Sequence, residues 1–241
     1  KDKTAVVVQT VSLRCGPGRP LAEIEKALEG LPFEFLEINR HGNKIKTGHV
    51  AANRFDIIVS GIDAGALPRA LAIADRLRQT GVPNFYGPQR FGAAMRNVYR
   101  GFDLLGKKGR VRKDAFMVSV VQSALFNIWL DHRIREGNFG RLLTGDIVKK
   151  TDTGGMFSVE DAATESARFD AGQLVYTGPM IGYKMKAATD AAGRHETALL
   201  ERFGLSGEDF RRLRSPGTRR EAILRPTDLA ISAVDEGLRF T

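Results

Sequence analysis

Apolar residues recur every three or four positions in several stretches, the spacing that places them on one face of an α-helix. In residues 66–80 this face consists of leucines and an alanine, and Gly81 follows at the position where helices commonly end. The longest stretch, residues 114–136, begins at Asp114, whose carboxylate can cap a helix N-terminus. The stretches predicted as helices are 21–30, 66–80, 114–136, 187–203 and 208–214.

Other apolar stretches are short, alternate with polar residues or are rich in Val, Ile and Thr, which is typical of strands. The predicted strands are 4–13, 33–38, 55–62, 156–159, 172–177, 223–224, 229–234 and 237–240. Strands stand at both ends of the chain with helices between them, and this order favours an α+β fold with a mostly antiparallel sheet. The last strands are expected to return to the first sheet, and the small polar run 151–155 is the clearest linker.

Composition narrows the possible partners and compartments. The 241 residues include 37 Lys and Arg against 28 Asp and Glu, a formal net charge of +9, which favours a polyanionic partner. The single Cys15 cannot form an internal disulfide, which is typical of a reducing compartment. No apolar run approaches the roughly 18 residues that a membrane span needs. We therefore expect a soluble, cytoplasmic protein without a membrane partner. A monomer is a separate expectation.

Residues 81–92 combine turn-forming residues with side chains that can bind nucleic acid. Amides and a guanidinium can contact base edges and phosphates, and aromatic faces can stack on bases. The alternative is a tight turn whose aromatic side chains fill the core. Besides its glycines and prolines, the stretch contains Asn84, Phe85, Tyr86, Gln89, Arg90 and Phe91.

This stretch resembles NYFGxQRFG, the signature of the TruD family of tRNA pseudouridine synthases. Other segments resemble further motifs of that family, in the same order along essentially the whole chain. They are Lys1-Asp2 with the residues after it (GxKDxxAxTxQ), residues 40–49 (RHxxKLRxG), Asn53-Arg54-Phe55 (GNxF), residues 120–127 (LQSxLFN) and Arg219-Arg220 (RR). Since the chain starts inside the first motif, the resemblance implies that it is an internal piece of a longer protein.

The resemblance implies a pseudouridine-synthase sheet flanked by helices, with a smaller α/β lobe inserted. Residues 1–151 would form the first part of the catalytic domain, 152–220 the inserted lobe and 221–241 the return. It also implies conversion of uridine to pseudouridine in tRNA, with uridine 13 as the family's typical target and no cofactor. The alternatives are the same chemistry on another RNA, or a non-catalytic RNA-binding or folding protein on the same scaffold.

Pseudouridine formation detaches uracil from C1′ and rejoins it through C5, so it needs one carboxylate beside the glycosidic bond. Asp2 occupies the family's catalytic position; whether it attacks C1′, attacks C6 or removes the 2′ proton stays open. A cation should keep Asp2 ionised in a closed site. Arg90 is the expected partner, because Lys1 would point to the opposite face of an extended strand.

The substrate residues follow from the same motifs. Tyr86, where the family usually has Phe, is expected to stack on a flipped base. Asn84 could anchor the loop or contact the base edge, and Phe91 is expected in the core. Gln122 and Asn127 could act in structure or in substrate contact. The expected substrate-binding residues are Lys1, Asn84, Tyr86, Gln89 and Arg90.

Basic residues concentrate in two loops that flank residues 81–92 in the sequence, and we expect them to contact phosphates. These residues are Arg40, Lys44, Lys46, Arg54, Lys107, Lys108, Arg110, Arg112 and Lys113. The four histidines show no ligand spacing, so no metal site is predicted. No phosphate-binding glycine motif follows a strand, which argues against a nucleotide cofactor.

Overall fold

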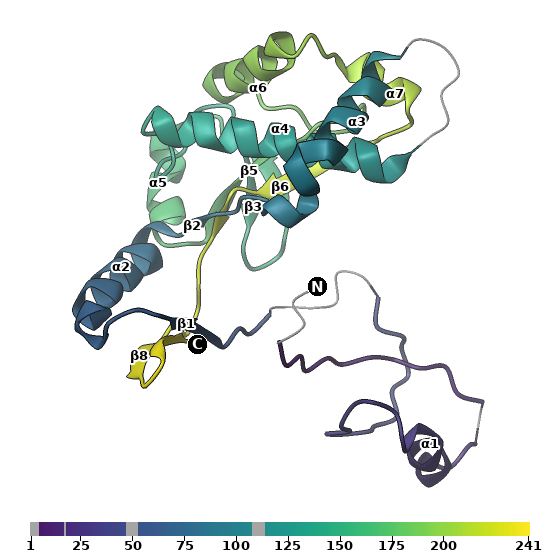
Figure 1. The fold of residues 1–241 in the computed structure, drawn as a ribbon. Helices are drawn as coiled ribbons and strands as arrows, with labels where there is room; N and C mark the ends of the chain where they lie inside the picture. The colour runs from purple at the N-terminus through teal and green to yellow at the C-terminus, as the bar shows by residue number, and fades with distance from the viewer. Residues whose placement is uncertain (1–4, 17, 47–52, 108–113) are drawn as a thin grey trace. The chain divides into compact units, whose positions relative to one another are not determined.

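The computed structural model describes residues 5–16, 18–46, 53–107 and 114–241 (Figure 1). The chain forms two compact units, Lys1–Asp56 and Ile57–Thr241. None of the helices in the described ranges is both long enough and apolar enough to cross a membrane.

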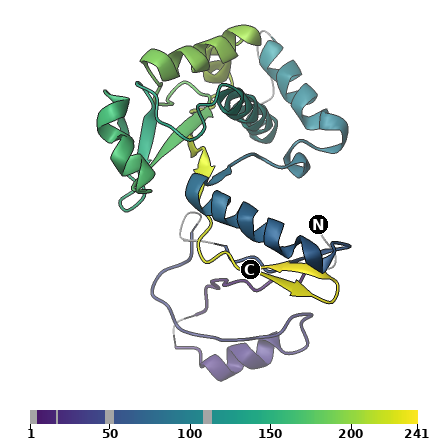
Figure 2. The same ribbon diagram turned by 90° about the vertical axis from the view of Figure 1, so that its left-hand side faces the viewer.

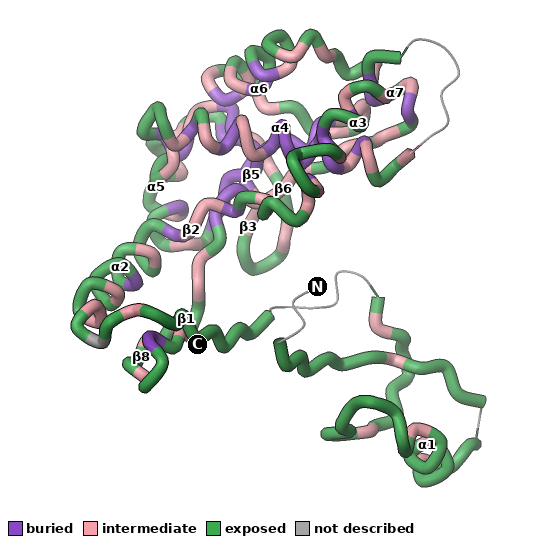
Figure 3. The backbone as a smooth tube through the Cα atoms, viewed as in Figure 1, coloured by how far each residue is buried: buried purple, intermediate pink, exposed green. Residues whose placement is uncertain are grey.

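The described part of the first unit has one regular element, the helix α1 (Leu21–Leu28). The strands predicted over 4–13 and 33–38 are wrong for the described residues, which are irregular there. The Val-rich segment is exposed (Figure 3), with 96% of Val6 accessible to solvent. A strand needs a neighbour for its backbone hydrogen bonds and for burial, and no strand pairs with this segment among the described residues.

The second unit contains a three-stranded antiparallel sheet in the order β1-β9-β8. Its strands are β1 (Ile57–Ser60), β8 (Ile231–Val234) and β9 (Gly237–Phe240). The helix α2 (Leu67–Thr80), which follows the short 3₁₀ helix η1 (Ala64–Ala66), packs against β8. The predicted return of the last strands to the first sheet is confirmed for β8 and β9, which join β1, whereas the predicted strand 223–224 pairs elsewhere.

The helix α2 ends where the sequence predicts, at Gly81. Gly81 has a φ of +74°, and a Cβ at this position would overlap the side chain of Ile223. The chain then enters β2 (Val82–Pro83), which pairs with β7 (Ile223–Leu224). The elements that follow are the 3₁₀ helices η2 (Pro88–Arg90) and η3 (Ala93–Met95) and the helix α3 (Arg96–Gly106), which the sequence analysis did not predict.

The longest helix, α4 (Ala115–Arg135), lies at the centre of the second unit's core. It packs against α3, α6 and β5, and many of its residues are buried (purple in Figure 3). Figure 2 shows α4 end-on beside the sheet. As predicted, the Asp114 side chain caps it, accepting a hydrogen bond from the Met117 N–H at 3.1 Å. Because α4 is covered on several sides, its apolar residues do not form a single stripe.

The core sheet has four antiparallel strands in the order β4-β3-β5-β6. Its strands are β3 (Ile147–Lys150), β4 (Met156–Ser158), β5 (Leu174–Met180) and β6 (Thr218–Glu221). The helix α5 (Ala162–Asp170) lies between β4 and β5 along the chain, and α6 (Asp190–Arg202) and α7 (Gly207–Arg212) lie between β5 and β6. The antiparallel α+β fold class is confirmed. The predicted lobe 152–220 stays a prediction; β3, which precedes it, shares this sheet.

Candidate active site

The signature loop, residues 81–92, is fixed to the sheet by Asn84. The Asn84 backbone N–H donates to the carbonyl of Ala222 at 2.9 Å. Its side-chain Nδ2 donates to the carbonyl of Glu221 at 2.8 Å, and the residue is buried. These bonds join the start of the loop to the chain that runs from β6 into β7. Asn84 therefore anchors the loop, and contact with a base edge stays a prediction.

Tyr86 is held by the side chain of Asn127 on α4. The Tyr86 N–H donates to Asn127 Oδ1 at 2.8 Å, and Asn127 Nδ2 donates to the Tyr86 carbonyl at 2.9 Å. This reciprocal pair satisfies both backbone groups of Tyr86 and connects two of the motifs found in the sequence. The Tyr86 ring is half-buried and meets Phe126 edge-on, with centroids 5.9 Å apart. Its hydroxyl lies 3.7 Å from Met180 Sδ.

Arg220 on β6 covers the ring of Tyr86. Its Cζ lies 3.9 Å from the Tyr86 ring centroid, and its Nη2 donates to Asn84 Oδ1 at 2.5 Å and to the Asn84 carbonyl at 3.2 Å. A guanidinium over an aromatic face is attracted by the ring quadrupole. Arg220 was not among the expected site residues. The paired arginines of the family motif were the only signal for it in the sequence.

Arg90 approaches the same ring from the signature loop. Its Nη2 donates to Ser119 Oγ at 2.8 Å and its Nε to Ser123 Oγ at 3.3 Å. The Arg90 Cζ lies 5.8 Å from the Tyr86 centroid. No ion pair joins Arg90 or Arg220 to a carboxylate among the described residues. Two guanidinium charges near one aromatic ring can bind an anionic group.

The expected partner of Arg90, Asp2, lies outside the described residues, as does Lys1. The catalytic role of Asp2 and its ion pair with Arg90 therefore stay predictions. Gln89 is exposed to solvent. Its contact with the substrate also stays a prediction.

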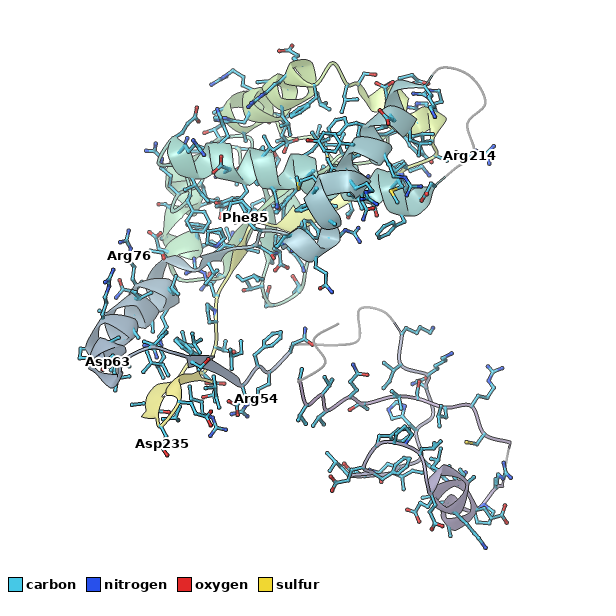
Figure 4. The ribbon with its side chains drawn as sticks, in the orientation of Figure 1. Arg54, Asp63, Arg76, Phe85, Arg214 and Asp235 are labelled. Carbon is cyan, nitrogen blue, oxygen red and sulfur yellow. The ribbon has the colours of Figure 1, made fainter. Side chains whose placement is uncertain are left out.

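The aromatic neighbours of Tyr86 in the signature loop lie in opposite environments. Phe91 is buried with Val98, Val120 and Ala124, which confirms its predicted place in the core. Phe85, which is labelled in Figure 4, is 41% exposed to solvent. The loop therefore combines a core aromatic, a half-buried one and an exposed one.

Gln122 has a structural role in α4. Its Nε2 donates to the Ile181 carbonyl at 2.6 Å and to Ser215 Oγ at 2.9 Å. The sequence left open a structural role or contact with the substrate for Gln122, and both observed bonds support the structural role. They connect α4 to the segments that follow β5 and α7.

The basic residues expected to bind phosphate are exposed where they are described. Arg40, Lys44, Lys46 and Arg54 belong to the first unit (Arg54 is labelled in Figure 4), and Lys107 follows α3 in the second. Their phosphate contacts stay predictions. The residues of this set that lie outside the described ranges are Lys108, Arg110, Arg112 and Lys113.

Comparison with known proteins identifies the family. The family model for tRNA pseudouridine synthase D (TruD) matches residues 1–107 and 112–241. The chain is 42% identical to tRNA pseudouridine synthase D of Anaeromyxobacter dehalogenans strain 2CP-C, covering 99% of this chain and 70% of that protein. It is 37% identical to the protein of the same name from Thermus thermophilus, covering 99% of this chain and 66% of the other.

A crystal structure described as TruD from Methanosarcina mazei has the same fold. The two structures superpose with a TM-score of 0.57 at 20% identity, over 74% of this chain and 62% of the other. At 20% sequence identity, this match shows a common fold and nothing more. Together with the family match and the curated relatives, it leads to one conclusion: the chain belongs to the TruD family of tRNA pseudouridine synthases.

Proposed function

We propose that this protein converts uridine 13 of tRNA to pseudouridine, with Asp2 as the catalytic carboxylate. The family match supports the reaction and its tRNA substrate. The arrangement around Tyr86 supports the site: the Tyr86 backbone is held by Asn127, and Arg220 and Arg90 lie at its ring. We propose that the protein acts as a cytoplasmic monomer without a cofactor.

The reaction needs no second substrate. The bond between C1′ and N1 of uracil breaks, the base turns, and a bond between C1′ and C5 forms. C5 then loses its proton and N1 gains one, so atoms and charges balance. The carboxylate of Asp2 acts beside C1′, C6 or the 2′ proton of the same nucleotide.

The positive charges of Arg90 and Arg220 are suited to the negative charges that the reaction brings together, which are the phosphates of the RNA and the carboxylate of Asp2. A nucleotide flipped out of structured RNA carries its phosphates into the site, and its base needs an aromatic partner. Arg90 and Arg220 are bound by neutral groups among the described residues, so their charge is available to phosphate or to the carboxylate of Asp2. Tyr86, and Phe85 beside it, supply aromatic surface.

The test is the substitution Asp2→Asn in the full-length protein. Asn keeps the shape of the side chain but can be neither nucleophile nor base, so product formation should be abolished. RNA affinity should change little, because phosphate contacts and stacking dominate it. The measurements are tritium release from tRNA labelled at uridine C5 and filter binding of the same tRNA.

Asp235→Asn is the matched control, since Asp235 is an exposed carboxylate between β8 and β9 (Figure 4). This variant makes the same chemical change and should keep full turnover. Turnover surviving in Asp2→Asn would remove Asp2 from the mechanism. Loss of RNA affinity in that variant would mean that Asp2 holds the binding site together.

A further inference from the structure

A cluster of two imidazoles and a carboxylate lies at the C-terminal end of α4. His132 and Glu136 lie four residues apart and therefore share one face of the chain at this helix end. His195 comes from α6, which packs against α4. Glu136 Oε1 lies 3.4 Å from His132 Nε2, and Glu136 Oε2 lies 3.4 Å from His195 Nε2.

These separations are longer than charge-assisted hydrogen bonds. Charge-assisted N–H···O bonds are about 2.7–2.9 Å long, so neither imidazole is drawn fully onto the carboxylate. Tetrahedral Zn²⁺ with bonds of about 2.0–2.1 Å places its ligand atoms about 3.3–3.4 Å apart. The nitrogens of both histidines and an oxygen of Glu136 all lie within 4.8 Å of one another. The two 3.4 Å separations involve different oxygens of Glu136, and the three residues lie close enough together that they could hold one metal ion.

We propose that His132, Glu136 and His195 form a Zn²⁺ site that fastens α6 to the C-terminal end of α4. Imidazole nitrogen and carboxylate oxygen are common zinc ligands, and the ion's fourth position would hold water. The arginines next to the cluster do not oppose the binding of a cation. Arg133 is paired with Asp146, and Arg135 with Asp131, each at 2.7 Å, so neither arginine leaves an unbalanced positive charge beside the ligands.

The ligands are accessible to an incoming ion. His132 and Glu136 are exposed and His195 is half-buried. Because His132 and His195 lie on separate helices, they show no ligand spacing in the sequence, and the expectation of no metal site rested on that spacing and on the single cysteine.

The zinc site would have a structural role. His132 lies thirteen positions after Ser119, about 20 Å along α4 from a hydroxyl that binds Arg90. The ion therefore has no contact with the signature loop. Its effect would be on the position of α6, whose Glu196 pairs with Arg219 at 2.7 Å. The proposal does not depend on the reaction that the protein catalyses.

The test is isothermal titration calorimetry of the EDTA-treated full-length protein with ZnCl₂. Wild type should bind one ion, and each of His132→Gln and His195→Gln should weaken binding at least tenfold, since altering even a group that merely supports a ligand costs about 10–100-fold in affinity. His41→Gln is the matched control, because His41 is exposed and its ring nitrogen contacts only its neighbour Asn43 in the described structure.

A second readout reports the geometry of the site. Co²⁺ in a four-coordinate site absorbs strongly in the visible range, so cobalt-loaded wild type should show this band and both cluster variants should lack it. Zinc should also raise the melting temperature of wild type and of His41→Gln, but not of the cluster variants. Absence of zinc binding by wild type, or binding by His132→Gln and His195→Gln that is as tight as that of wild type, would overturn the proposal.

Discussion

Two regions of the second unit place an arginine over a tyrosine, but they balance its charge differently. Arg133 lies 3.7 Å from the Tyr176 ring centroid, and Arg220 lies 3.9 Å from that of Tyr86. Arg133 donates two hydrogen bonds to the carboxylate of Asp146, both at 2.7 Å, with side chains only 3% and 1% exposed. Arg220 donates to the neutral Asn84.

The difference separates a structural cation from one that can bind a ligand. Burial alone would lower the pKa of Arg133, but the charge and hydrogen bonds of Asp146 raise it. Burial raises the pKa of Tyr176, which stays neutral. The charge in this region is therefore balanced within the core. Around Tyr86 the charges of Arg220 and Arg90 are not balanced by a carboxylate among the described residues, so they can attract an anion.

The largest expected effect is in the balanced region. Asp146→Asn should lower the free energy of unfolding by about 3–5 kcal/mol, because it leaves the charge of Arg133 buried without a counter-ion. Asp131→Asn is the matched control: its partner Arg135 is exposed, and such pairs contribute only about 0–1 kcal/mol. Urea denaturation measures both. If both variants lost the same free energy of unfolding, the burial of the Arg133–Asp146 pair would not make it more important for stability than the exposed Arg135–Asp131 pair.

The second prediction concerns the unbalanced region. Arg90→Gln should leave stability nearly unchanged, because Arg90 is half-buried and its partners are hydroxyls. Its kcat/KM on tRNA should fall about 10–100-fold, since hydrogen bonds to charged groups contribute about 1.5–3 kcal/mol. Arg96→Gln, an exposed arginine at the start of α3, is the control. Unchanged kcat/KM in Arg90→Gln would remove this guanidinium from the site.

The sequence predicted best the elements whose patterns are local. The helix α2 ends at Gly81 and α4 begins at Asp114 because a glycine with positive φ and a capping carboxylate act within one turn. Strand β6 was missed because Thr218–Glu221 is charged, and its pairing with β5 is a tertiary property. The valines near Val6 have strand composition, yet no strand pairs with them among the described residues.

The candidate site was predictable in outline and not in its contacts. Family motifs identified Tyr86 and Arg90, but motifs do not show which groups hold them. That Asn127 binds the backbone of Tyr86, and that Arg220 covers its ring, depends on the packing of α4 against the sheet. Likewise His132 and His195 come together only through the packing of α4 on α6.

The smallest expected effect compares the two tyrosines that carry the arginines. Tyr176→Phe should cost about 1–3 kcal/mol of stability, because the Tyr176 hydroxyl donates to the Phe139 carbonyl at 3.0 Å and that acceptor would lose its partner. Tyr86→Phe should cost less than about 0.5 kcal/mol, because among the described residues its hydroxyl bonds only to Met180 Sδ, a weak acceptor, at 3.7 Å.

The ring of Tyr86 and its bonds to Asn127 do not involve the hydroxyl, so tRNA turnover should also survive in Tyr86→Phe. Urea denaturation of both variants and tritium release by Tyr86→Phe are the measurements. A large loss of turnover with unchanged stability would assign the hydroxyl a role in the reaction. It would also mean that the exchange of Phe and Tyr at positions 85 and 86, relative to the family signature, alters the chemistry of the site.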